Sequence, residues 1–266
     1  MNWVIGDIHG MFRPLDALLA AVARRDPAAH IVFVGDYVNR GADSRRVIDL
    51  LLTVSNATFL RGNHDDVLDL LLHGDCYICH PTAPERLSAF HWFMQHGLAE
   101  TLSSYGADWA ELESTARAPS PAAVDRCVSV VPESHRAFFR ALKPVYESDA
   151  FFVAHGYWDP DERDYSPRVA ERLGTDPQLR YRLLWGRFTE AQIARKKKWR
   201  RTGYFGHTPV FNYRAGVEFT PVRGPNLVLL DTAVALSAVG MLSAVCVETG
   251  VVVQANRGGE TLELTE

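Results

Sequence analysis

Six short stretches of this sequence carry Asp, Asn or His, most of them beside a glycine. They are Gly6-Asp7-Ile8-His9, Gly35-Asp36, Gly62-Asn63-His64, His155-Gly156, Gly206-His207 and Leu230-Asp231. Carboxylate, amide and imidazole ligands without cysteine suit Mn, Fe or Zn, and the carboxylate content favours Mn²⁺. We therefore expect a hydrolytic centre with two divalent metal ions, Mn²⁺ first and Fe or Zn as alternatives, about 3.5–4 Å apart.

Each of these stretches follows an apolar run that predicts a strand. Trp3–Ile5 precedes the first stretch, Ile31–Val34 the second and Phe151–Val153 the fourth. In α/β sheets, ligands collect beyond the carboxyl ends of the strands. Loops that lie far apart in the chain can therefore converge on one site.

Helical spacing of apolar residues fills most of the intervening chain. Pro14–Arg25 follows the first glycine-rich turn, so the chain opens as an α/β unit. From about residue 73 to about residue 146 the pattern is mostly helical, and strand patterns return after it. We expect an α/β fold in a single domain, residues 1–266, with a helical insertion at about 73–146.

The composition argues against a nucleic-acid-binding protein and against a membrane-spanning one. The chain has 266 residues, 47% of them hydrophobic, and a net charge of −4, so no general nucleic-acid surface is expected. The least polar stretch, 232–247, is too short to span a membrane. No signal-peptide pattern precedes Trp3–Ile5, and we expect a cytoplasmic protein without membrane contact. The oligomeric state stays open.

Two of the four cysteines form the pattern Cys76-Tyr-Ile-Cys79-His80. This pattern occurs in haem attachment and in half of some zinc sites. Because the sequence has no export signal and no second CxxC pair, we expect reduced, inert thiols. The role of Cys76 and Cys79 stays open.

The order of the motifs carries a resemblance. The motifs are GDIHG at 6–10, GDYVNRG at 35–41, RGNHD at 61–65, HG at 155–156 and GHTP at 206–209. Together they resemble the metal-site motifs of calcineurin-like metallophosphoesterases, and most of all the bacterial phosphoprotein phosphatases, the PPP-type Ser/Thr protein phosphatases. The resemblance implies a two-sheet sandwich flanked by helices (αββα). It also implies that a metal-bridging hydroxide hydrolyses phosphomonoesters of Ser, Thr or Tyr.

The same resemblance assigns six metal ligands: Asp7, His9, Asp36, Asn63, His155 and His207. The first two belong to one ion, the last three to the other, and Asp36 bridges both. His64 falls at the position of the general acid and Arg40 at that of a phosphate-binding arginine. Arg187 falls at the position of a second phosphate-binding arginine, in a looser match.

Asn39 departs from the family pattern. Phosphoprotein phosphatases usually have Asp there, and its carboxylate orients the general-acid histidine and holds its proton. The Asn39 amide oxygen can accept a hydrogen bond from His64 but has no charge, so we expect a lower pKa for His64. An alkoxide leaving group needs that proton, whereas a departing phosphate, with a second pKa of about 6, needs it less. Asn39 therefore favours phosphoanhydrides or aryl phosphates.

Three functions follow from these motifs. A protein-phosphatase-like phosphomonoesterase, with a phosphorylated protein or peptide as substrate, is the first. The alternative is a symmetrical diadenosine tetraphosphate hydrolase acting on a nucleotide polyphosphate, because these enzymes share the fold and commonly lack the Asp at this position. The third is a non-catalytic metal-binding pseudophosphatase.

Other charged residues allow simpler interpretations. Asp65 and Asp66 are expected as charges in the first turn of a helix. Asp231 is either a turn residue or a group that orients a ligand histidine. The basic run at 195–201 is either a solvated face or a field that attracts an anionic substrate.

Overall fold

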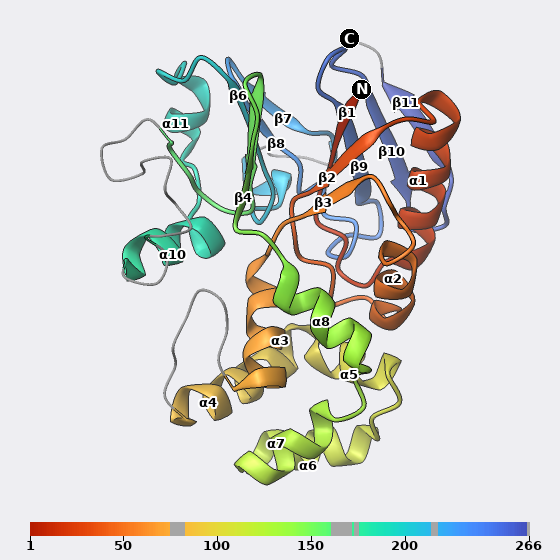
Figure 1. Ribbon diagram of the computed structural model, residues 1–266, viewed down its shortest axis with the longest axis vertical. Helices are drawn as coiled ribbons and strands as arrows, with labels where there is room; N and C mark the ends of the chain where they lie inside the picture. The colour runs from red at the N-terminus through yellow and green to blue at the C-terminus, as the bar shows by residue number, and fades with distance from the viewer. Residues whose placement is uncertain (75–82, 161–171, 173–175, 214–217, 265–266) are drawn as a thin grey trace.

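The computed structural model describes residues 1–74, 83–160, 172, 176–213 and 218–264. Figure 1 shows two β-sheets in its upper half, with helices outside them and a mostly helical region below. Cys76 and Cys79 lie outside the described residues. Within the described part, no helix has the length and apolar character needed to cross a membrane.

The first sheet has six strands in the order β11-β10-β9-β1-β2-β3. The bounds are β1 (Asn2–Ile5), β2 (His30–Phe33), β3 (Ala57–Phe59), β9 (Met241–Cys246), β10 (Val252–Asn256) and β11 (Thr261–Leu264). Strands β1, β2 and β3 are parallel, whereas β9 pairs antiparallel to β1. The carboxyl ends of the three parallel strands therefore share one edge.

The second sheet has five strands in the order β4-β5-β6-β8-β7. The bounds are β4 (Val145–Glu147), β5 (Phe151–Ala154), β6 (Thr202–Phe205), β7 (Val222–Gly224) and β8 (Leu227–Leu229). Its central strands β5, β6 and β8 are parallel. This sheet also presents three carboxyl ends together.

Apolar side chains pack the sheets and helices as layers. Val4 and Val32 of the first sheet share one cluster with Val153 and Val228 of the second, so the sheets pack face to face. The outer face of the first sheet packs on α1 (Phe12–Arg25) and α2 (Ser44–Leu51), and the outer face of the second packs on α10 (Pro177–Trp185) and α11 (Glu190–Ala194). This arrangement is the expected αββα sandwich.

Helices also occupy the region between β3 and β4, where a helical insertion is predicted. They are α3 (Asn63–His73), α4 (Ala83–Phe93), the π-helical turn η1 (Met94–Leu98), α5 (Ala99–Ser104), α6 (Trp109–Arg117), α7 (Pro121–Val128) and α8 (Glu133–Ala141). In Figure 1 they lie beneath the sheets. A short 3₁₀ turn, η2 (Val210–Asn212), follows β6. The single-domain assignment stays a prediction.

Gly97 in η1 joins this helical region closely to the loop after β2. Its φ is +92°, a conformation that side chains other than glycine rarely adopt, and a Cβ atom there would overlap the backbone nitrogen of Arg40. A π-helical turn that carries a glycine kink often marks a functional position. Here it lets the helical region lie directly against Asn39 and Arg40.

We predict that Gly97→Ala destabilises the protein and displaces Arg40. The left-handed φ costs about 1–2 kcal/mol and the overlap about 1–3 kcal/mol more. Gly106→Ala is the matched control, because Gly106 has a φ of +103° and no atom lies within 4 Å of the point that an added Cβ would occupy. Urea unfolding measures both variants, and equal losses would show that the close approach at Gly97 has no energetic role.

Candidate active site

The six predicted loops meet at the carboxyl ends of the two sets of parallel strands. Asp36, in the loop after β2, lies at their centre. Its Oδ2 is 3.5 Å from His9 Nε2 and 3.4 Å from His155 Nε2. Asp36 is thus placed to reach ligands that come from both sheets, which is the position expected of a residue shared by two ions.

Asn63, at the start of α3, connects the remaining ligands. Its Oδ1 is 2.9 Å from His155 Nε2 and 2.9 Å from His207 Nδ1. The backbone N–H of His207 donates to Asp7 Oδ2 at 3.0 Å. All six predicted metal ligands therefore lie close together, and each of these residues is at most 8% exposed.

Backbone carbonyls orient the three histidines that are predicted as metal ligands. His9 Nδ1 is 3.0 Å from Val38 O, His155 Nδ1 is 3.1 Å from Val34 O and His207 Nε2 is 3.2 Å from Trp185 O. Because a carbonyl only accepts, the facing ring nitrogen carries a proton, and the other nitrogen is directed to the centre, where its lone pair would bind a metal ion. Metal-binding histidines are held in this way.

Asp7 gives a further test of whether the site fits metal ions. Its buried Oδ1 has no hydrogen-bond partner. Burial and the negative charge of Asp231 raise the pKa of Asp7 well above its usual range. Burial alone would also raise the pKa of Asp36, but the charge of His155 opposes it, and the pKa of Asp36 lies well below its usual range. An unpartnered oxygen among buried carboxylates and lone pairs fits divalent cations, which supply the missing positive charge.

Backbone strain is concentrated at the same residues. Among the described residues other than glycine, those with positive φ are His9, Asp36, Asn39, Arg40, His207 and Ala233. Such conformations cost about 1–3 kcal/mol each and persist only where neighbouring contacts fix them. The site therefore needs groups that hold its loops in place.

Asp65 is one such group, and the sequence predicts only a helix-terminal charge there. Its Oδ2 accepts from the N–H groups of Asp36 at 2.7 Å and Gly62 at 3.0 Å, and its Oδ1 accepts from Tyr37 at 2.9 Å. Burial and the Asp36 charge raise the pKa of Asp65 to about 7. Its position three residues after Gly62, where capping-box acids occur, is the signal that could have revealed this role.

Arg61 and Asp66 form a second buried support. Arg61 Nη1 donates to Asp66 Oδ1 at 3.2 Å and to Asp69 Oδ2 at 2.8 Å, and its Nη2 donates to Phe139 O at 2.7 Å. Asp66 thus pairs with a fully buried guanidinium in addition to facing the helix dipole. Asp231 accepts from the N–H of Ala233 at 3.1 Å, as a turn residue does, and burial raises the pKa of Asp231 to about 6.

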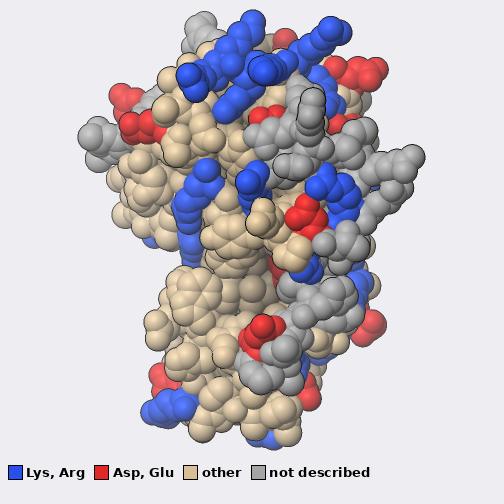
Figure 2. All heavy atoms as spheres, turned by 90° about the vertical axis from the view of Figure 1, so that its left-hand side faces the viewer, with Lys and Arg blue, Asp and Glu red and all other residues tan. Residues whose placement is uncertain are grey.

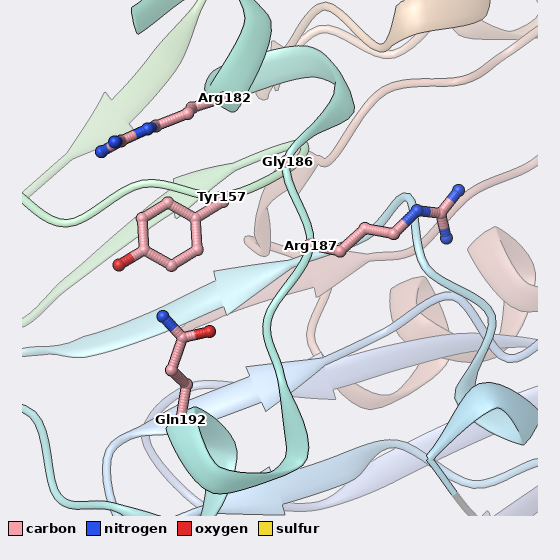
Figure 3. Close-up of a pocket in the computed structure, with 5 residues that line it drawn as sticks. All are labelled: Tyr157, Arg182, Gly186, Arg187 and Gln192. Carbon is pink, nitrogen blue, oxygen red and sulfur yellow. The ribbon is translucent and has the colours of Figure 1, made fainter. Parts of the chain in front are cut away.

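A cavity of about 440 Å³ opens over this centre and is lined by Asp36, Asn63 and His207 together with both predicted phosphate-binding arginines. Arg40 Nη1 is buried without a hydrogen-bond partner. Arg187 Nη1 donates to Thr208 Oγ1 at 3.4 Å. Figure 3 shows the Arg187 side chain pointing away from Tyr157 and Gln192, which lie on the other side of the loop that carries Arg187. Both guanidinium groups are therefore available to one anionic ligand.

Asn39 contacts the predicted general acid, but its amide is turned the other way from the expectation. Asn39 Oδ1 accepts from Thr101 Oγ1 at 3.0 Å, and Asn39 Nδ2 lies 2.8 Å from His64 Nδ1. The amide nitrogen donates, so His64 Nδ1 accepts. Burial, with the charge of Arg40 adding to it, lowers the pKa of His64 to about 4.

The basic run at 195–201 lies between α11 and β6 in the chain and is largely solvated. Arg195, Lys196, Lys198 and Arg200 are exposed. Figure 2 shows Lys and Arg gathered at the top of this face of the molecule, where α11 ends and β6 begins in Figure 1.

An α/β sandwich with a buried Asp, Asn and His centre beyond its strands defines a metallohydrolase. Residues 3–186 match the family model described as calcineurin-like phosphoesterase. The chain belongs to the calcineurin-like phosphoesterase family. This family uses a dinuclear centre of divalent metal ions, and side chains of the kinds that bind metal gather in the groups Asp36-His155-His207 and His9-Asp36-His64.

Two similar proteins are both described as symmetrical bis(5'-nucleosyl)-tetraphosphatases. A symmetrical bis(5'-nucleosyl)-tetraphosphatase of Coxiella burnetii (strain Dugway 5J108-111) is 35% identical over 99 residues, 34% of each chain. One of Shewanella frigidimarina (strain NCIMB 400) is 31% identical over 113 residues, 39% of this chain and 41% of that one. The match thus spans about a third of the length of the first of these relatives.

Solved structures share the fold over most of the chain. One described as a candidate diadenosine tetraphosphatase has a TM-score of 0.53 at 20% identity and covers 96% of this chain and 92% of its own. A cold-active protein tyrosine phosphatase has a TM-score of 0.52 at 15% identity, and the match covers 100% of this chain and 78% of that one. The resemblance to bacterial phosphoprotein phosphatases is therefore shown only at the level of the wider family.

We predict that Asp65→Asn loosens the metal centre although Asp65 does not face it. An amide presents one acceptor oxygen and one NH₂ group, so at least one backbone N–H loses its partner at a cost of about 1–3 kcal/mol. Unfolding measures the loss and metal analysis measures ion retention. Asp16→Asn, the same change at an exposed position on α1, is the control. Full metal content and unchanged stability in Asp65→Asn would contradict the role of Asp65.

Proposed function

We propose that this protein is a dinuclear-metal-dependent phosphoanhydride hydrolase whose substrates are dinucleoside polyphosphates, of the symmetrical diadenosine tetraphosphate type. The observation that carries the proposal is the Asn39 amide nitrogen at 2.8 Å from His64 Nδ1. The names of the curated relatives support the same substrate class.

Thr101 fixes the direction of the Asn39 amide. The N–H of Asn39 donates to Thr101 Oγ1 at 2.8 Å, and the Thr101 hydroxyl has one proton, which goes to Asn39 Oδ1. Ser44 Oγ, 3.0 Å from Thr101 Oγ1, supplies the remaining donor. With its oxygen engaged, Asn39 can offer only N–H to His64.

This contact decides where His64 carries its proton. Since Nδ1 accepts, the neutral ring holds its single proton on Nε2, which points to the cavity beside Arg40 Nη2 at 3.5 Å. Arg40 Nη2 and His64 Nε2 are then both donors that face the cavity, and an anionic oxygen between them would accept from both. His64 and Arg40 therefore stabilise a leaving or phosphoryl oxygen by hydrogen bonding, without a carboxylate that would favour full proton transfer.

A leaving group of low basicity suits this arrangement. A departing phosphate has a second pKa of about 6, whereas an alkoxide must be protonated as it leaves. Bound at Asp7, His9, Asp36, Asn63, His155 and His207, the two ions would supply positive charge at the phosphoryl group and lower the pKa of water. Arg40 and Arg187 bind and orient the remaining phosphate oxygens.

A protein phosphatase is the second candidate. It is favoured by Arg187, which matches a phosphate-binding arginine of the bacterial phosphoprotein phosphatases and lines the cavity. A phosphotyrosine ester, with a phenolate leaving group whose pKa is about 10, is the monoester that this site would tolerate best. The complete set of six ligands argues against the non-catalytic alternative.

A substrate panel with Mn²⁺ tests the proposal. We expect kcat/KM for diadenosine tetraphosphate to exceed that for phosphotyrosine peptides, and both to exceed that for phosphoserine peptides by at least about 100-fold, the lower range of general-acid contributions. Asp36→Ala, which removes the shared ligand, should abolish all three activities. Faster hydrolysis of phosphoserine than of the dinucleotide would refute the proposal.

We further predict that Asn39→Asp shifts the preference towards alkyl esters. The new carboxylate keeps its bond from Thr101 and accepts from a protonated His64, which becomes a general acid. The ratio of kcat/KM for phosphoserine peptide to that for diadenosine tetraphosphate should rise by about 10-fold or more. Asn212→Asp, an exposed change in the same cavity, controls for added charge. An equal change across all substrates would count against the role of Asn39.

A further inference from the structure

We propose that Trp92 and Phe211 form a stacking platform for the nucleobase of a nucleotide whose phosphates are bound by Arg40 and Arg187. The inference rests on the proposed function and extends it to the part of the substrate that takes no part in the reaction. All four residues line the cavity over the metal centre.

Exposure is the first observation. Within the described part of the chain, four aromatic residues are exposed, namely Trp92 at 47%, Trp109 at 46%, Tyr181 at 65% and Phe211 at 39%. Two of the four line this one cavity. Large aromatic surfaces left open beside a polar site are a common feature of ligand pockets.

The aromatic surface is continuous with the metal centre. The rings of Trp92 and Trp185 are 6.0 Å apart, and those of Trp185 and His207 are 6.1 Å apart. The rings of Trp92 and His96 are 4.1 Å apart at an angle of 40°, so His96 supports Trp92 from one side. A ligand held by its phosphate at His207 and Arg40 therefore meets aromatic faces as it extends outwards.

The chemistry of the cavity selects the ligand class. Guanidinium groups bind phosphate and exposed aromatic faces bind a flat ring by stacking, and both kinds of group line this cavity. A nucleotide carries both groups joined through a sugar, whereas a phosphoserine peptide has no ring beside its phosphate.

Removal of the platform should selectively weaken the binding of nucleotides. Stacking of a base on an aromatic residue contributes a factor of about 5–100 in affinity. In Trp92→Leu and in Phe211→Leu we expect the ratio of kcat/KM for diadenosine tetraphosphate to that for inorganic tripolyphosphate to fall by at least about 5-fold, mainly through KM. Trp92→Phe keeps a ring and should retain most of the ratio.

Trp109→Leu is the matched control, because Trp109 is equally exposed but lies on α6 and does not line the cavity. Its ratio should equal that of the wild type. Equal ratios in Trp92→Leu, Phe211→Leu and Trp109→Leu would overturn the proposal.

A binding measurement separates this inference from the proposed function. In the Mn²⁺-loaded protein, calorimetry compares ADP with inorganic pyrophosphate. ADP should bind at least about 5-fold more tightly in the wild type and in Trp109→Leu, and this preference should vanish in Trp92→Leu. If the wild type cleaves no dinucleotide but keeps this pattern, the proposed function fails and the platform stands. A platform that affects phosphotyrosine turnover but not ADP binding would overturn the nucleobase assignment.

Discussion

The carboxylate of Asp65 is the contact on which the rest of the site depends. It accepts three backbone N–H groups, from Asp36, Tyr37 and Gly62, and so joins the loops that follow β2 and β3. Asp36 has a φ of +55° and would relax without this support. A side chain at Gly62 would overlap the Asp36 carboxylate, so the same constraint explains the glycine. One buried acid thus fixes the position of Asp36, the residue predicted to be shared by two metal ions.

The carbonyls that orient the histidines extend this constraint to both sheets. His9 and His155 are held by carbonyls of the segment that follows β2, although His155 itself follows β5 in the other sheet. The face-to-face packing of the two sheets therefore sets the distance between ligands, and no single loop could form the centre. The buried carboxylates of Asp7, Asp36 and Asp231 also need compensating positive charge, which links the stability of the folded site to metal binding.

The sequence predicts the fold well, and it places each predicted ligand next to its own strand and glycine. It predicts less where a role depends on a distant partner. Asp65 could be placed at a helix start, but the loops it accepts from become visible only in the fold. Asn39 shows the limit most clearly. Its amide was expected to present oxygen to His64, and the oxygen is instead taken by Thr101, 62 residues further along the chain.

Thr101 also shows what the helical region contributes to function. It lies on α5, a few residues after the kink at Gly97 that packs against Arg40. Trp92, at the mouth of the cavity, lies a few residues before the same kink. One segment therefore sets the direction of the Asn39 amide, on which the proposed leaving-group preference rests, and also supplies the exposed ring proposed to contact the nucleobase. Because none of the six metal ligands belongs to this segment, its sequence can change substrate preference while the metal centre stays intact.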